Sequence, residues 1–334
     1  MNSINKIAFT LLSSACIFSC TPEKKTDVVV TNSPNETVIP EKPRVVPPDF
    51  NADTAFEFVK TQSDMGPRTP GSKAHDKCIA WLESKLKKYG AVVKIQGGSA
   101  TTFDGKQWRI DNVIASFDPT NKERILLCAH YDSRPMADRD PKPENKTKPV
   151  PGINDGASGV GVLLEIARII KDKQPTLGID IILFDLEDYG EAREAKSWCL
   201  GSQYWANSPH KANYSARFGI LLDMVGAKGA IFPREGASRV YAGEILNKVW
   251  KASEKAGYKS FFSDIDVPEM TDDNGPINEI AKVKCIDIIH YIPGPNNNGD
   301  FFEHHHRVSD DLSNIDKTTL KAVGQTLLEV IYNE

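Results

Sequence analysis

Four short runs of apolar residues constrain the fold of this chain more than any other feature. They are residues 125–129, 179–184, 218–222 and 285–289, of which the second is interrupted by Asp180 and the last by Asp287. A continuous apolar run of this length is typical of a strand covered on both faces, as in a parallel sheet. Segments with helical spacing lie between the runs, so we predict an α/β domain.

Helices and two more strands complete the predicted domain. We expect strands at one edge of the sheet at residues 92–96 and 108–117. The spacing of apolar residues predicts helices at residues 53–60, 75–89, 158–171, 240–256 and 317–332. No internal repeat or further linker interrupts residues 49–334, which we therefore expect to form a single open-sheet domain.

Charge and cysteine content exclude several classes of protein. The chain carries 41 Lys and Arg against 45 Asp and Glu, a net charge of −4. Such a balance gives no basic surface for sequence-independent nucleic-acid binding, so we expect no nucleic-acid partner. Six cysteines in 334 residues are too few for a disulfide scaffold. A globular protein with a full-sized hydrophobic core remains.

Residues 1–20 have the organisation of a bacterial lipoprotein signal peptide. Lys6 precedes an apolar run at residues 7–18, which is too short to span a bilayer and has the length of a signal-peptide core. The run ends at Ser19 and Cys20, which resemble a lipobox, whose cysteine is acylated and becomes the mature N-terminus. The alternative is an ordinary cleaved signal in which Cys20 has no special role.

A charged, proline-rich segment at residues 21–48 follows and is predicted to be an extended tether. We therefore expect an exported lipoprotein of the bacterial cell envelope, on its periplasmic or surface side, that meets the membrane only through its lipid anchor. An exported compartment permits disulfides. The sequence leaves open how the remaining cysteines pair: Cys78, Cys128, Cys199 and Cys285.

Polar side chains follow three of the apolar runs where the predicted strands end. His130 follows the first run, Glu187 and Asp188 come shortly after the second, and Asp223 follows the third. Because an open α/β sheet binds ligands at the carboxyl ends of its strands, we expect these side chains to form one cluster. Neighbouring residues of a strand point to opposite faces, so Glu187 and Asp188 both reach the cluster only if the chain bends there.

Two other positions extend this set. Asp155 lies just before a predicted helix, and His306 lies in a run with His304 and His305. Imidazole and carboxylate groups are zinc ligands, and a catalytic zinc typically has three protein ligands and one open position. Each residue also has a purely structural interpretation, such as a helix N-cap for Asp155. Their coincidence at matching topological positions favours a metal site.

Five motifs of the chain resemble the zinc-aminopeptidase family of type M28. They are residues 66–72, 129–133, 154–159, 184–188 and 222–226. Within that superfamily the chain is most similar to the bacterial members of the animal-type glutaminyl cyclases. Three features carry this similarity: an insert at residues 134–151, the pair Glu187 and Asp188, and residues 232–236. The resemblance implies a mixed, mostly parallel central sheet flanked by helices.

The resemblance also implies one catalytic zinc ion. The ligands that it implies are Asp155, Asp188 and His306. We select His306 because it lies four residues before Asp310, which is six before Asp316, as in the family motif. His305 and His304 are the fallback choices.

The same resemblance assigns roles to four further side chains. Glu187 is implied to be the general acid/base, and Asp223 its hydrogen-bonding partner. Asp273 resembles a third acidic residue of the cyclase site. Trp198 is a candidate aromatic wall for the substrate, with core packing as the alternative.

The activity that the resemblance implies is cyclisation of an N-terminal glutamine to pyroglutamate, with release of ammonia. The expected substrates are peptides or proteins with N-terminal Gln, and we expect a monomer. One alternative is a dinuclear-zinc aminopeptidase, in which His130 and Asp223 hold a second zinc ion and Asp155 bridges. Another is a non-catalytic lipoprotein that binds peptides or glycans on the same fold. The number of zinc ions per chain separates the three.

Replacing Cys20 by Ser tests the lipid anchor. Wild-type protein should incorporate labelled palmitate, whereas Cys20→Ser should carry no label and should leave the membrane or stay unprocessed. Stable anchoring requires more than one acyl chain, so loss of the acylated cysteine removes the attachment. Cys16→Ser, within the apolar run, is the matched control and should keep the label. Absence of label from the wild-type protein contradicts the lipoprotein prediction.

Overall fold

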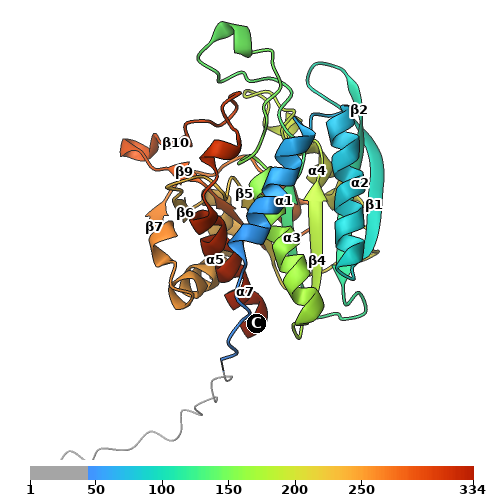
Figure 1. The fold of residues 1–334 in the computed structure, drawn as a ribbon, viewed down its shortest axis with the longest axis vertical. Helices are drawn as coiled ribbons and strands as arrows, with labels where there is room; N and C mark the ends of the chain where they lie inside the picture. Colours follow the sequence, from blue (N-terminus) through green and yellow to red (C-terminus); the bar gives the residue numbers. More distant parts are fainter. Residues whose placement is uncertain (1–43) are drawn as a thin grey trace, which may run out of the picture. The chain divides into compact units, whose positions relative to one another are not determined.

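A six-stranded sheet runs through residues 44–334, the part of the chain that this computed structural model describes (Figure 1). Its strands are β1 (Val92–Thr101), β2 (Gln107–Phe117), β3 (Arg124–His130), β4 (Gly178–Phe184), β5 (Gly219–Asp223) and β8 (Cys285–Ile289). Their spatial order is β1-β2-β4-β3-β5-β8. β2 pairs antiparallel with β1 and with β4, and the other neighbours pair in parallel. The expected mixed, mostly parallel sheet is confirmed.

The four apolar runs of the sequence form four adjacent parallel strands, β4, β3, β5 and β8. Every residue of these strands is buried, whereas exposed and half-buried residues dominate the edge strand β1. Burial on both faces explains why these runs show no alternation of polar residues. Because the four strands are parallel, their carboxyl ends meet at one edge of the sheet, the upper edge in Figure 1.

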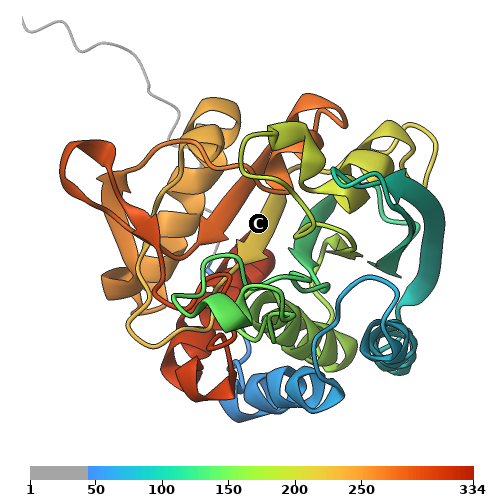
Figure 2. The ribbon, with the colours of Figure 1, turned by 90° about the horizontal axis from the view of Figure 1, so that it is seen from above.

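All five predicted helices are present. They are α1 (Ala52–Met65), α2 (Lys73–Lys88), α3 (Ala157–Asp172), α5 (Gly236–Lys255) and α7 (Lys317–Asn333). These helices share the larger hydrophobic core with one face of the sheet (Figure 2). A smaller core on the other face contains side chains of α4 (Leu200–Asn207) and α6 (Asn274–Glu279). These two helices have only eight and six residues, too few for a periodicity to predict them.

Several short elements surround the carboxyl edge of the sheet. β6 (Phe232–Arg234) pairs in parallel with β7 (Phe262–Asp266), and β9 (Tyr291–Ile292) pairs antiparallel with β10 (Asp300–Phe301). Single 3-10 turns lie in the connections at Pro143–Asn145, Ala195–Ser197, Lys259–Phe261, Pro295–Asn297 and Leu312–Asn314. The insert at residues 134–151 also lies at this edge, and Figure 2 shows it in green.

The predicted signal peptide, Cys20 and residues 21–43 of the predicted tether lie outside the described residues. The last tether residues pack on the domain, since Arg44 pairs with Glu329 at 2.9 Å and the Val45 N–H donates to Asn333 Oδ1 at 2.8 Å. Within residues 44–334, no helix combines the length and the apolar character that a membrane span requires. The described cysteines are free and buried: Cys78, Cys128, Cys199 and Cys285.

Candidate active site

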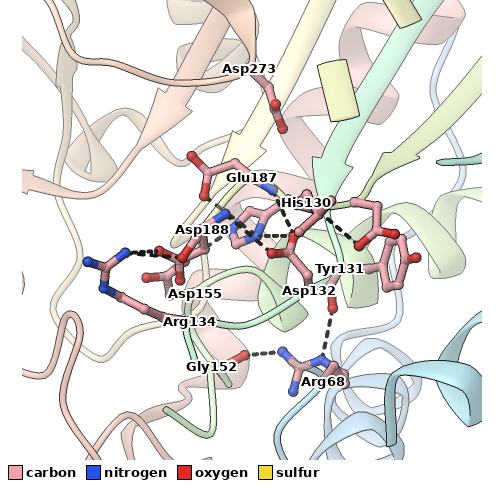
Figure 3. Close-up of polar contacts among 12 residues, drawn as sticks. Arg68, His130, Tyr131, Asp132, Arg134, Gly152, Asp155, Glu187, Asp188 and Asp273 are labelled. Carbon is pink, nitrogen blue, oxygen red and sulfur yellow. Dashed lines mark hydrogen bonds and ion pairs between the residues drawn. The ribbon is translucent and has the colours of Figure 1, made fainter. Parts of the chain in front are cut away.

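A cavity of about 590 Å³ opens at the carboxyl edge of the sheet. The predicted site residues that line it are Asp155, Glu187, Asp188, Trp198, Asp223 and His306. Glu187 and Asp188 reach the cavity because the chain bends after β4, where Leu186 has a φ of 51°. The strand ends therefore deliver their polar side chains to one place, as the sequence indicated (Figure 3).

The three predicted zinc ligands lie together. His306 Nε2 is 3.1 Å from Asp188 Oδ1 and 3.9 Å from Asp155 Oδ2. Zinc bonds of about 2.0–2.2 Å in a tetrahedral site place ligand atoms roughly 3.3–3.5 Å apart, so one ion fits this group. Both side-chain oxygens of Asp188 are buried, and neither accepts a hydrogen bond of regular geometry from the described residues. Such oxygens suit a cation as their partner.

A second group of possible ligands shares Asp155 with the first. His130 Nε2 lies 3.0 Å from Asp155 Oδ1 and 3.1 Å from Asp223 Oδ1. Asp155 therefore presents Oδ1 to His130 and Oδ2 to His306. The residues of a dinuclear site are all in place.

The three consecutive histidines have different surroundings. His304 Nδ1 lies 2.9 Å from Ser309 Oγ, and His304 does not line the cavity. His305 lines it, but Arg139 Nη1 donates to its Nδ1 at 2.8 Å, and its Nε2 is 3.8 Å from Asp155 Oδ2. Of the three, His306 is the one that faces both Asp155 and Asp188. This arrangement favours His306 as the ligand.

Buried carboxylates fix the backbone that carries the ligands. Asp132 accepts the N–H groups of Glu187 and Asp188 at 3.2 and 3.3 Å, and Asp132 Oδ1 is 3.5 Å from His130 Nδ1. It is fully buried. Because these bonds form within the protein, they position the site independently of any ion.

Asp310 has the same role for the loop that carries Asp155. Its two oxygens accept the N–H groups of Asn154 and Asp155 at 2.9 and 3.2 Å. In the sequence, the spacing of Asp310 from His306 served only to choose among the three histidines. Its hydrogen bonds explain why an acidic residue at that spacing matters.

Arg68, from the motif at residues 66–72, joins the end of β3 to the end of the insert (Figure 3). This side chain is fully buried and donates to the carbonyl oxygens of Tyr131 at 3.0 Å, Pro151 at 2.8 Å and Gly152 at 2.5 Å. It satisfies three carbonyls that no strand partner reaches, and so fixes the loop before Asp155.

The insert contacts the predicted metal ligands from outside. Asp138 Oδ1 lies 3.5 Å from His306 Nδ1, which leaves Nε2 free to face the metal position. Arg134 donates to the Asp188 carbonyl at 3.1 Å and lies 3.5 Å from Asp188 Oδ1. Arg134 also binds both oxygens of Asp138, at 2.7 and 2.9 Å. Neither residue was predicted to act on the site, although opposite charges four positions apart in the insert were a usable signal.

Trp198 lies on the cavity wall and is only half-buried, which matches the predicted wall better than core packing. Its ring stacks on His306 with centroids 5.8 Å apart and planes 13° apart. The Arg134 guanidinium lies 4.7 Å from the centroid of the same ring. The indole N–H donates to the Glu191 carbonyl at 3.0 Å, so the ring is held in this orientation.

Glu187 has the electrostatic environment of a proton carrier. Its Oε2 is 4.0 Å from His130 Nδ1, and the side chain is 8% exposed. Burial raises the pKa of Glu187 well above its usual value; His130 opposes this shift, and Asp188, Asp272 and Asp273 add to it. A carboxyl whose pKa moves toward neutrality is suited to general acid/base chemistry.

Asp223 and Asp273 lie elsewhere than their predicted roles suggest. Asp223 lines the cavity, but its side chain lies at hydrogen-bond distance from His130. The family resemblance had implied Glu187 as its hydrogen-bonding partner. Burial raises the pKa of Asp223 to about 6. Asp273 is fully buried behind the cavity wall, and its neighbour Asp272 lines the cavity instead. Burial raises the pKa of Asp273 to about 7.

The whole site concentrates buried acidic groups. The buried acidic residues around the cavity are Asp132, Asp155, Glu187, Asp188, Asp223, Asp272, Asp273 and Asp310. Burial lowers the pKa of His306, but Asp188 and Asp138 outweigh it and raise that pKa to about 9. Without an ion, His306 therefore binds a proton at neutral pH. Imidazole and carboxylate groups in one buried cluster are a combination of ligands that fits zinc.

Comparison with known proteins identifies the family. The model of peptidase family M28 matches residues 112–331. The chain belongs to this family. The M28 resemblance inferred from the five motifs is thus confirmed.

Solved structures and curated proteins include both cyclases and aminopeptidases. The glutaminyl cyclase of Bacteroides thetaiotaomicron is 48% identical, with a TM-score of 0.83 and coverage of 86% of this chain and 100% of that one. A leucine aminopeptidase precursor from Bacteroides thetaiotaomicron is also 48% identical, with a TM-score of 0.83 and coverage of 87% and 99%. Aminopeptidase YwaD of Bacillus subtilis is 27% identical over 229 residues, 66% of this chain and 44% of that protein. This M28 chain thus spans less than half the length of that curated relative.

Removing the Asp138 carboxylate should weaken zinc binding without unfolding the domain. We expect Asp138→Ala to bind zinc about 10–100-fold more weakly, the usual effect of losing the partner that orients a ligating histidine. Competition with a chromophoric chelator measures the affinity. Glu144→Ala removes an exposed carboxylate from the same insert and should leave the affinity unchanged. Equal affinities of Asp138→Ala and wild type would refute the role of Asp138.

Proposed function

We propose that this protein is a zinc-dependent glutaminyl-peptide cyclotransferase, which converts the N-terminal Gln of peptides and proteins to pyroglutamate and releases ammonia. The likeness to a bacterial glutaminyl cyclase over the full length of that chain supports this. The observation that carries the proposal is the position of Glu187. This buried carboxyl lines the cavity next to Asp188 and His306 but stays outside their ligand group.

The reaction needs a base, an acid and a polarised carbonyl. The substrate's α-amine attacks the carbon of the γ-carboxamide, so a new C–N bond forms and the bond to the amide nitrogen breaks. Glu187 accepts a proton from the attacking nitrogen and delivers it to the leaving nitrogen, which departs as ammonia. When bound, zinc polarises the γ-carbonyl and stabilises the negative charge that develops on its oxygen.

The remaining side chains position these groups. Asp138 and Arg134 hold His306 and Asp188 at their outer sides, which keeps the inner sides directed to the metal position. Trp198 provides a flat apolar surface beside His306, against which the substrate side chain can lie. Because the nucleophile belongs to the substrate, orientation supplies much of the rate acceleration.

A dinuclear aminopeptidase is the second candidate, because His130, Asp155 and Asp223 form a second ligand group. In that enzyme Glu187 takes a proton from an attacking water molecule, and the peptide bond is the bond that breaks. A similar structure from Bacteroides thetaiotaomicron, a leucine aminopeptidase precursor, keeps this candidate in consideration. A non-catalytic binding lipoprotein has no specific observation in its favour. We also propose that the protein acts outside the cytoplasm, anchored through Cys20.

The mass change of a substrate peptide separates the two enzymes. A Gln-initiated peptide should lose about 17 Da, the mass of one ammonia, while its peptide bonds stay intact. Leu- and Ala-initiated peptides of otherwise identical sequence should remain unchanged, because they offer no γ-carboxamide. Purified protein should contain about one zinc ion per chain. Release of free Leu or Ala by a protein with two zinc ions would establish the aminopeptidase instead.

Replacing Glu187 by Gln tests its role as the proton carrier. Glu187→Gln should keep zinc and the fold while turnover falls about 10²–10⁴-fold, the usual contribution of a general acid/base. His306→Ala should instead lose zinc. Glu191→Gln, an exposed acidic residue a few positions on, is the matched control and should keep full turnover. Loss of zinc from Glu187→Gln together with its retention in His306→Ala would reverse the assignment.

A further inference from the structure

Cys199 lies directly against the proposed proton carrier. Its backbone N–H donates to the Glu187 carbonyl at 3.0 Å, and the N–H of Leu200 donates to the Leu186 carbonyl at 3.0 Å. These bonds attach the start of α4 to the bend that follows β4. The Cys199 Sγ consequently lies 3.4 Å from Glu187 Oε1, and only 2% of the residue is exposed.

Asp272 supplies a further oxygen at the same place. It lines the cavity, although only 5% of the residue is exposed. Its Oδ1 accepts the N–H of Asp273 at 2.6 Å, and no hydrogen-bond donor among the described residues faces its Oδ2. Asp287 is fully buried near it and adds another carboxyl, whose pKa burial and the neighbouring acidic groups raise well above its usual value. Glu187, Cys199 and Asp272 each contribute one possible ligand atom, and these three atoms lie within 4.8 Å of one another.

We propose that Glu187, Cys199 and Asp272 form a separate binding site for a thiophilic divalent cation, such as Cd²⁺ or excess Zn²⁺. A thiolate at about 2.3 Å and a carboxylate oxygen at about 2.1 Å from one tetrahedral ion lie roughly 3.6 Å apart. The observed separation of 3.4 Å between Sγ and Oε1 needs little adjustment to reach this value.

The chemistry of this site differs from that of the catalytic group. A thiolate ligand selects soft or borderline cations, whereas Asp155, Asp188 and His306 offer only oxygen and nitrogen. Burial and the neighbouring Glu187 raise the pKa of the Cys199 thiol well above its usual value. An entering cation therefore displaces a proton from sulfur, which restricts the site to cations that bind thiolate strongly.

Occupation of this site inhibits the enzyme. An ion bound to the Glu187 carboxylate uses the oxygen that must accept the substrate proton. The inhibition rests on the proposed function, since it assumes that Glu187 is the proton carrier. Binding of the ion does not rest on it, because the three side chains form the site whichever reaction the enzyme catalyses.

Cadmium provides the test, because a cadmium–thiolate bond has its own ultraviolet charge-transfer absorption. Zinc-loaded full-length protein is titrated with CdCl₂, and its zinc content is measured after the titration. We expect the absorption band to saturate at one Cd²⁺ per chain while zinc is retained. Cadmium that replaces zinc at Asp155, Asp188 and His306 gives no such band, because that group contains no sulfur. Cyclisation of a Gln peptide should fall in parallel with the growth of the band.

Two cysteine variants locate the signal. Cys199→Ser should abolish the band, whereas Cys78→Ser should keep it, because Cys78 is equally buried but lies in α2, outside the group formed with Glu187 and Asp272. Asp272→Asn should weaken Cd²⁺ binding tenfold or more while Cys199 and zinc remain in place. Circular dichroism establishes that each variant is folded.

Two results overturn the proposal: a wild-type protein that keeps its zinc and shows no band at saturating cadmium, or a band that persists in Cys199→Ser. If Cys199→Ser does not fold, Asp272→Asn decides, and wild-type cadmium affinity in that variant rejects the site. A protein that shows the Cys199-dependent band but never cyclises Gln peptides disproves the proposed function and leaves the metal site standing.

Discussion

The concentration of acidic groups at one edge of the sheet is the constraint on which the rest of the site depends. Carboxylates buried this close repel one another and are unfavourable unless hydrogen-bonded or paired with cations. The protein meets part of this requirement itself. Backbone N–H groups of neighbouring loops donate to the carboxylates of Asp132 and Asp310, and Arg134 lies beside Asp188. The side-chain oxygens of Asp188 accept no hydrogen bond of regular geometry from the described residues, so a bound cation would add stability there as well as chemistry.

The fold was predictable where a strand is buried on both faces, because consecutive residues of such a strand are then mostly apolar. β3, β4 and β5 are buried along their whole length, and their interior residues are apolar except for Asp180 of β4. The short elements were not predictable, because tertiary contacts rather than local patterns determine them. Trp205 of α4 illustrates this: its ring packs edge-on against Phe184 of β4 with centroids 6.0 Å apart, although nothing near it in the sequence indicates a helix.

Some residues of the candidate site were likewise predictable from the sequence, and others were not. Residues at strand ends, such as His130 and Glu187, were predictable because topology alone brings them together. Asp138 acts on His306, which is far away in the sequence, and only the folded path of the insert brings the two side chains to 3.5 Å. Asp272 and Asp273 show that the sequence can locate an acidic pair without showing which member faces the cavity. The local turn decides this, and it is Asp272 that lines the cavity.

His130 links the number of metal ions to the choice between cyclase and aminopeptidase chemistry. Its Nε2 lies within hydrogen-bond distance of both Asp155 and Asp223. A proton on Nε2 makes those contacts favourable but occupies the position that a second zinc ion needs, so the proton and that ion exclude each other. Hydrolysis by a dinuclear site requires the ion there, to activate water. Cyclisation requires no water, because the nucleophile is the substrate's own amine, already held at high effective concentration. A proton on His130 Nε2 is therefore compatible with the proposed cyclase, whereas the dinuclear aminopeptidase would have to displace it to bind its second ion.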